Sequence, residues 1–152
     1  MVPQCQVAFE KLKHVMTSDP VLMIGNFDKP FKLAIDASDV GVGAVLFQED
    51  SHGFDHPISY FSKKLNNAQR KYSTIEKETL SLVLAIQHYE IYVTGPFPVT
   101  VFTDHNPLTY INKFKNKSQR LMRWSLFLQE YNLDYKHIPG KENVLADCLS
   151  RC

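Results

Sequence analysis

The spacing of apolar residues along the chain changes from helical to strand-like and back several times. Segment 4–17 carries apolar residues at helical spacing and ends at the breaker Ser18-Asp19-Pro20, which predicts a short helix followed by a turn. Three runs of strand-forming residues follow at hairpin distances, at 31–38, 41–48 and 57–63. The first half of the chain therefore predicts one helix and three hairpin-connected strands.

The second half opens with the signature of a helix start. Ser73 and Glu76 form a capping box, in which each side chain bonds a free backbone N–H of the first turn. The apolar stripe after them predicts a helix that ends before Gly95-Pro96. The remaining pattern predicts a strand at 97–103, a helical turn at 107–111, a helix at 118–131, a strand at 132–138 and a helix at 143–150.

These elements predict an α/β fold with a mixed five-stranded sheet and helices on both faces. The helix after Ser73 leads from the hairpin strands to strand 97–103. Such a connection is expected to be a right-handed crossover, which lets strand 97–103 lie parallel to an earlier strand.

Length and composition narrow the class of protein. The chain has 152 residues, 44% hydrophobic and 22% charged, which excludes a disordered, collagen-like or disulfide-scaffold protein. The apolar runs are too short or too interrupted for a membrane span, and residues 1–9 lack the pattern of a signal peptide. We therefore expect a soluble chain in a reducing compartment, with Cys148 as a small core residue of the last helix.

The net charge of +1 does not by itself attract nucleic acid, but the basic residues are clustered. Nine of the 17 lie in two short segments without acidic residues: Lys63, Lys64, Arg70 and Lys71, then Lys113, Lys115, Lys117, Arg120 and Arg123. Such segments fit contacts with phosphates, and each taken alone fits a solvated face equally well.

Two aspartates stand at the carboxyl ends of predicted strands. Asp36 shares a strand face with Ala34, and Asp104 shares one with Thr100 and Phe102. In parallel neighbouring strands these carboxylates would lie close together, at the edge of an α/β sheet where ligands bind.

Two further acidic residues lie on predicted helices, and one of them, Asp147, would be a surface aspartate if taken alone. Glu78 lies inside the apolar stripe of the helix after Ser73, whereas Glu76 is explained by its capping role. An edge glutamate paired with a lysine is the alternative for Glu78. Asp147 follows Val144 by three positions on the last helix, whose packed side is expected to hold Val144, Leu145, Cys148 and Leu149. Four carboxylates in one place need cations, and Mg²⁺ binds carboxylates, waters and phosphate oxygens.

Several motifs together closely resemble the ribonuclease H domain of gypsy-type LTR retrotransposon reverse transcriptases. They are IDAS at 35–38, GVGAVL at 41–46, HPISYFSKKL at 56–65, YSTIEKE at 72–78, TDHNPL at 103–108, RW at 123–124 and PGKENVLADCLSR at 139–151. The resemblance implies a ribonuclease H domain over 31–152. It identifies 1–30 as similar to the segment that joins the polymerase part of such polyproteins to this domain.

The resemblance implies an endonuclease that cuts the RNA strand of RNA–DNA hybrids with two Mg²⁺ ions, Mn²⁺ being a substitute. Asp36 would bridge the ions, Glu78 and Asp104 would help hold one, and Asp147 would help hold the other. The implied partners are the hybrid and the polymerase part of the parent polyprotein. The implied location is the cytoplasm, in a virus-like particle, or the nucleus after adoption by a host.

Some interpretations stay open. Cellular ribonucleases H carry a catalytic histidine in the loop before the last aspartate, and 139–142 contains none. His137, at a strand end, is either a strand residue or a proton shuttle. Trp124 fits the core better than a stacking platform for bases. His105 fits either a substrate contact or the start of a turn. A rival function is a catalytically retired module that binds hybrid or a protein.

Overall fold

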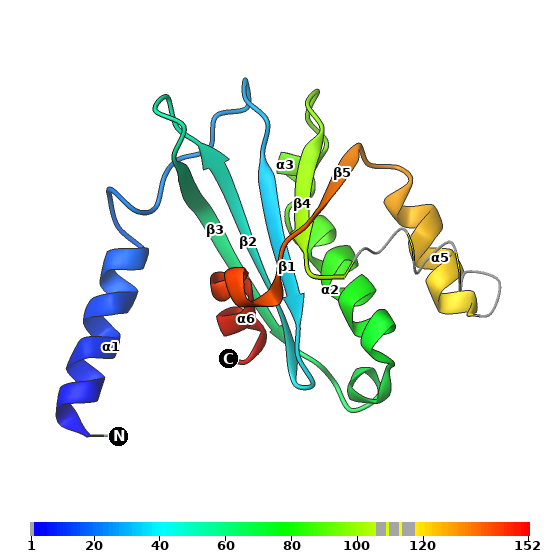
Figure 1. Ribbon diagram of the computed structural model, residues 1–152, viewed down its shortest axis with the longest axis horizontal. Helices are drawn as coiled ribbons and strands as arrows, with labels where there is room; N and C mark the ends of the chain where they lie inside the picture. Colours follow the sequence, from blue (N-terminus) through cyan, green and yellow to red (C-terminus); the bar gives the residue numbers. More distant parts are fainter. Residues whose placement is uncertain (1, 106–108, 110–112, 114–117) are drawn as a thin grey trace.

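The computed structural model describes residues 2–105, 109, 113 and 118–152, and its centre is one five-stranded sheet in the order β3-β2-β1-β4-β5 (Figure 1). The strands are β1 (Lys32–Ala37), β2 (Gly41–Glu49), β3 (Asp55–Lys64), β4 (Val99–Thr103) and β5 (Leu133–His137). The first three pair antiparallel, while β4 is parallel to both β1 and β5. The predicted mixed sheet and the parallel placement of strand 97–103 are confirmed.

Helices cover both faces of this sheet, as predicted. The helices and short 3₁₀ turns are α1 (Pro3–Met16), η1 (Gln69–Lys71), α2 (Thr74–His88), α3 (Glu90–Val93), α5 (Gln119–Leu128), η2 (Gly140–Glu142) and α6 (Val144–Ser150). The single helix expected up to Gly95 is two helices, because the chain leaves helical geometry at Tyr89. The expected helical turn at 107–111 lies almost wholly outside the described residues.

The main core fills the space between the sheet and α2. Leu33 and Ile35 of β1 pack there with Leu82 and Ile86 of α2, all fully buried. Trp124 of α5 is partly buried against this core, which agrees with the interpretation of Trp124 as a packing residue. The predicted capping box is present: Ser73 accepts a bond from the Glu76 N–H, and Glu76 accepts one from the Ser73 N–H. This cap fixes where α2 begins, and thereby which of its side chains face the sheet.

The opposite face of the sheet carries α6, whose packed side differs from the prediction. Val144, Leu145 and Cys148 are exposed, whereas Ala146 and Ser150 are buried. The physical reason is that α6 lies directly on the backbone of β2 at Gly43, where an added Cβ would come within 2.3 Å of the Ala146 carbonyl oxygen. Only small side chains fit such a contact, so the larger apolar residues point outward.

Helix α1 lies beside the β3 edge and buries none of its residues (Figure 1). The Tyr60 hydroxyl of β3 donates to the carbonyl oxygen of Met16 and so ties the end of α1 to the sheet. The division into 1–30 and 31–152 stays a prediction. No described helix is long and apolar enough to cross a membrane.

Candidate active site

The two strand-end aspartates lie at one edge of the sheet. Asp36 is the penultimate residue of β1, and Asp104 directly follows β4. The parallel register pairs Ala34 with Phe102, so continuing it by two residues sets Asp36 beside Asp104. The parallel pairing of β1 and β4 therefore carries both carboxylates to the same place.

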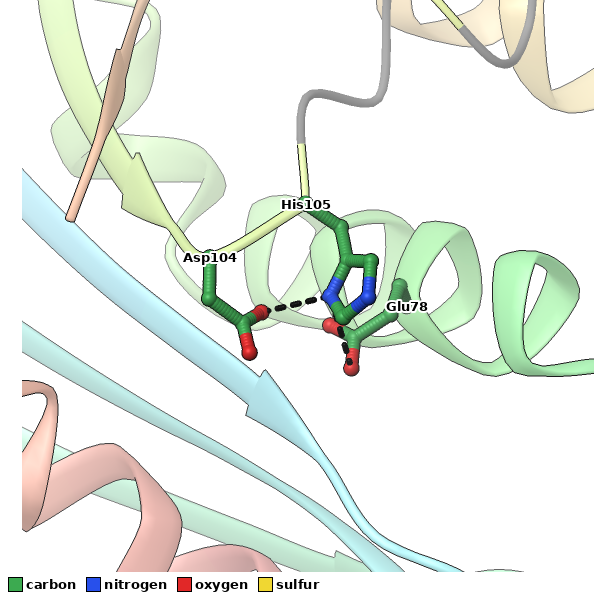
Figure 2. Close-up of side chains that lie close together, drawn as sticks. All are labelled: Glu78, Asp104 and His105. Carbon is green, nitrogen blue, oxygen red and sulfur yellow. Dashed lines mark hydrogen bonds and ion pairs between the residues drawn. The ribbon is translucent and has the colours of Figure 1, made fainter. Parts of the chain in front are cut away.

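Glu78 approaches the same edge from α2 (Figure 2). It is only 6% exposed, and its Oε2 is buried without a hydrogen-bond partner among the described residues. His105 Nδ1 lies 2.7 Å from Asp104 Oδ1 and 3.8 Å from Glu78 Oε1. One potential ligand atom from each of Glu78, Asp104 and His105 falls within 4.8 Å of the other two. The alternative of a glutamate that reaches solvent or a lysine does not hold for Glu78.

The electrostatics of these carboxylates show that they act on one another. Burial, then the charges of Asp104 and Asp36, raises the pKa of the Glu78 carboxyl to about 8. Burial also raises the pKa of Asp36 to about 6, with the charges of Asp104 and Asp147 adding to it and a Ser150 hydrogen bond opposing it. Full ionisation of these carboxylates is therefore unfavourable without a cation, and a bound cation would favour their charged forms.

The fourth carboxylate comes from the other face of the sheet. Asp147 of α6 is partly exposed and accepts a bond from Arg151 Nε at 2.8 Å. It also acts on the Asp36 carboxyl electrostatically. The backbone of Gly140 runs past Asp104, since a Cβ on Gly140 would lie 3.2 Å from Asp104 Oδ2. Among the described residues, Glu78, Asp104 and His105 therefore form the closest group of possible ligands, and Asp147 is linked to it through its charge effect on Asp36.

This cluster fits a hard divalent cation. Its donors are carboxylate oxygens with one imidazole beside them, and the partnerless buried Glu78 Oε2 is an oxygen that a cation would satisfy. Carboxylate oxygens are preferred ligands of Mg²⁺ and Mn²⁺. The residues present therefore suit the ions that the sequence predicts.

The basic residues predicted to bind nucleic acid are placed differently from one another. Lys63 and Lys64 are exposed at the end of β3, and Arg70 and Lys71 are exposed on η1. Arg120 instead bonds Glu76 at 2.8 Å, and its guanidinium lies 3.9 Å from the centre of the Tyr72 ring.

The rest of the second basic segment is only partly described. Lys113 and Arg123 are exposed. Lys115 and Lys117 lie outside the described residues. The structure therefore gives positions to seven of the nine predicted contacts, of which Arg120 joins α5 to the start of α2.

Sequence reasoning missed two buried polar residues that hold the site together. Asn143 Nδ2 donates to the Ile35 carbonyl oxygen at 2.7 Å, and Ser150 Oγ donates to Asp36 Oδ2 at 2.8 Å. Both flank the α6 segment that carries Asp147, so their three- and four-residue spacing from it was the available signal. His105 bonds Asp104, and His137 is exposed at the end of β5 in register with Thr103.

Comparison with known proteins agrees with this architecture. The family described as "RNase H-like domain found in reverse transcriptase" matches residues 26–131. The Retrovirus-related Pol polyprotein from transposon opus of Drosophila melanogaster is 42% identical over 144 residues, covering 95% of this chain and 14% of the polyprotein. The Transposon Tf2-3 polyprotein of Schizosaccharomyces pombe is 39% identical over 147 residues, covering 95% and 11%. The chain thus spans a small part of the length of these relatives.

Solved structures show the same fold at low sequence identity. The foamy viral protease-reverse transcriptase in complex with RNA/DNA hybrid superposes with a TM-score of 0.66 at 16% identity, covering 92% of this chain and 19% of that one. LC11-RNase H1, isolated from compost, gives a TM-score of 0.57 at 17% identity, covering 80% and 92%. The chain belongs to the RNase H-like domains of retrotransposon reverse transcriptases, as they occur in Pol polyproteins of the opus and Tf2 type.

Proposed function

We propose that this domain hydrolyses the RNA strand of RNA–DNA hybrids with two divalent metal ions. The observation that carries the proposal is the buried Glu78 carboxylate, which lies close to Asp104 and His105 and whose Oε2 has no side-chain hydrogen-bond partner among the described residues. A carboxylate buried beside other acidic groups, with a pKa raised by burial and by the charges of Asp104 and Asp36, is typical of a functional site and favours the nuclease over a binding module.

The four carboxylates divide the work of holding the ions. Asp36 would bridge both, Glu78 and Asp104 would help hold one, and Asp147 would help hold the other. The chemistry that a pair of divalent ions would supply there is activation of the attacking water and stabilisation of the leaving 3′ oxygen. The chain's own contribution would be to hold the carboxylates of β1, α2, the end of β4 and α6 in fixed positions, because ion spacing depends on those positions.

The substrate would be held mainly through its phosphates. The exposed cations Lys63, Lys64, Arg70 and Lys71 lie on β3 and η1, next along the chain to the start of α2 that carries Glu78. Phosphate contacts fix the register of a nucleic acid, while the 2′-hydroxyl groups distinguish RNA from DNA. The similarity to a reverse transcriptase solved with an RNA/DNA hybrid supports this choice of substrate.

The natural partner would be the polymerase part of the same polyprotein. The curated relatives are Pol polyproteins of which this chain spans 14% or less. A connected polymerase would supply further contacts with the hybrid and would raise its effective concentration at the domain. The domain would then act in the compartment where the element is reverse transcribed.

Cleavage of a labelled RNA–DNA hybrid in Mg²⁺ or Mn²⁺ tests the proposal, with double-stranded RNA as the reference substrate. We expect cutting of the hybrid alone, and its loss in Asp104→Asn. Asp134→Asn is the matched control, since Asp134 is an exposed aspartate of β5 away from the cluster. Binding of the hybrid without cutting under either ion would refute the proposal and support the rival binding module.

A further inference from the structure

One buried hydroxyl touches the carboxylate at the centre of the cluster. Ser150, the last residue of α6, is fully buried, and its Oγ lies 2.8 Å from Asp36 Oδ2. The same oxygen lies 2.8 Å from the carbonyl oxygen of Asp147. A serine hydroxyl has one proton to donate, and an ionised carboxylate is a stronger acceptor than a carbonyl. The proton is therefore directed to Asp36 whenever that group is charged.

Ser150 is held in place by contacts that do not involve Asp36. Its carbonyl oxygen accepts a bond from Ser38 Oγ at 2.6 Å, and the preceding carbonyl, of Leu149, accepts one from Ser62 Oγ at 2.6 Å. At Gly43 a Cβ would come within 2.5 Å of the Ser150 nitrogen, so the backbones are in direct contact. The hydroxyl is thus a fixed reference point for the Asp36 side chain rather than a group that follows it.

The other end of the same segment is tied to the same strand. Asn143, just before α6, is buried and bonds the carbonyl oxygen of Ile35, the neighbour of Asp36. Together the two bonds lock α6 to β1 on either side of Asp147. Among the described residues, Ser150 is the side chain that donates to Asp36.

We infer that Ser150 is a positioning residue, which holds the Asp36 carboxylate by its Oδ2 in one orientation, at the strand end that Asp36 shares with Asp104, for cation binding. This inference rests on the proposed two-ion function. A purely structural serine, which bonds the Asp147 carbonyl to finish the last turn of α6, is the competing explanation. The two differ in one respect: only a positioning role makes the hydroxyl matter for ion binding beyond its effect on folding.

The test is direct Mn²⁺ binding to the folded chain without nucleic acid, measured by calorimetry and by the electron paramagnetic resonance of free Mn²⁺. We expect Ser150→Ala to weaken binding by about tenfold or more, as loss of an outer-shell hydrogen bond to a ligand does. Ser62→Ala is the matched control, because it removes a hydrogen bond to α6 without touching Asp36. It should change Mn²⁺ binding by less than about threefold, and thermal melting of both variants measures how much stability each substitution costs.

A second comparison separates orientation from general loosening of α6. In an Asp36→Asn background the carboxylate is gone, so Ser150→Ala should cause no further loss of Mn²⁺ affinity. Should Ser150→Ala fail to fold, Ser150→Cys fills the space with a much weaker donor, and the same comparison is made with it.

Binding by Ser150→Ala within about threefold of the unchanged chain would overturn the inference, as would an equal loss in Ser62→Ala. Because the assay contains no hybrid, its outcome is distinct from that of the cleavage test. A chain that binds Mn²⁺ but cuts nothing refutes the proposed function and leaves Ser150 to be judged by binding. A chain that binds no Mn²⁺ refutes both.

Discussion

Removing the charge of Glu78 should stabilise the metal-free fold. Unfolded glutamate has an ordinary pKa near 4.5, whereas burial and two neighbouring carboxylates raise the pKa of Glu78 to about 8 in the folded chain. The folded chain therefore binds this proton more tightly than the unfolded chain. Stability is then highest below pH 4.5, falls as the pH rises, and stops falling above pH 8.

The size of the effect follows from the same two values. At pH 7 the unfolded carboxyl is ionised and the folded one is mostly protonated, so the difference is about 2.5 pH units, or roughly 3 kcal/mol at about 1.4 kcal/mol per unit. For a chain of this length that corresponds to about 6 to 12 °C in melting temperature. Asp36 should add a smaller loss of stability of the same sign, as the pH rises from its ordinary pKa of 3.8 to its folded pKa of about 6.

The measurement is thermal melting of Glu78→Gln and the unchanged chain in chelator, from pH 4.5 to pH 8.5. The two should melt alike at the acidic end, and Glu78→Gln should melt higher at neutral pH. Adding Mg²⁺ should narrow the gap, because the unchanged chain alone has the full set of carboxylates for the ions.

Glu76→Gln is the control on the same helix and has the opposite sign. Burial alone would raise the pKa of Glu76, but hydrogen bonds from Ser73 and the Arg120 ion pair lower it below its usual value. Its charge therefore stabilises the fold, and Glu76→Gln should melt lower than the unchanged chain at pH 7. Equal melting of Glu78→Gln and the unchanged chain at pH 8 without metal, or shifts of one sign in both variants, would refute the reasoning.

Three other outcomes follow from the structure. Gly43→Ala should push α6 off β2, and should thereby lower the free energy of unfolding by about 2 kcal/mol and the rate of hybrid cleavage by more than tenfold. Gly95→Ala is the control: an added Cβ there would lie 3.9 Å from the nearest atom, so melting and cleavage should change little. Arg120→Met should lower the free energy of unfolding, measured in urea, by about 1 kcal/mol through its lost ion pair and ring contact. Lys64→Met should instead weaken hybrid binding without changing the free energy of unfolding. In the folded chain Cys148 should react with a thiol reagent without prior unfolding, and slow labelling would contradict its exposure.

The order of elements was predictable because each has a clear period and clear ends. The capping box fixed the start of α2, and the hairpin spacing fixed the pairing of the first three strands. The break at Tyr89 was not predictable, since the apolar stripe continues through it into α3. Periodicity shows which side of a helix is apolar, but it does not show a local loss of helical geometry.

The site was predictable where a residue conflicted with its surroundings. Asp36 and Asp104 end apolar strands, and Glu78 interrupts an apolar stripe, so each stood out from the sequence. Ser150 did not, because a serine in the last turn of a helix is normally a surface residue. Its burial depends on Gly43 across the sheet, and a contact between such distant residues leaves no local pattern.

The prediction of which side of α6 is buried was wrong for the same reason. Leu145 and Cys148 have the composition of a packed face, but the close approach of two backbones leaves room only for residues such as Ala146. Apolar composition predicts burial where helix and sheet are separated by side chains. It does not predict burial where a glycine lets the backbones of the helix and the sheet come into direct contact.

The shortness of α6 has a consequence for how the cluster behaves in time. Seven residues do not form a stable helix alone, so we expect α6, although tied to the sheet by hydrogen bonds, to open at a lower free-energy cost than global unfolding. Ions that require Asp147 would bind only the closed form of α6. They would reduce the population of the open form roughly a hundredfold when the free ion concentration is a hundred times the dissociation constant. Under the proposed chemistry, divalent ions would therefore stabilise the closed position of α6. Hydrogen exchange at the α6 amides should slow as the ions are added.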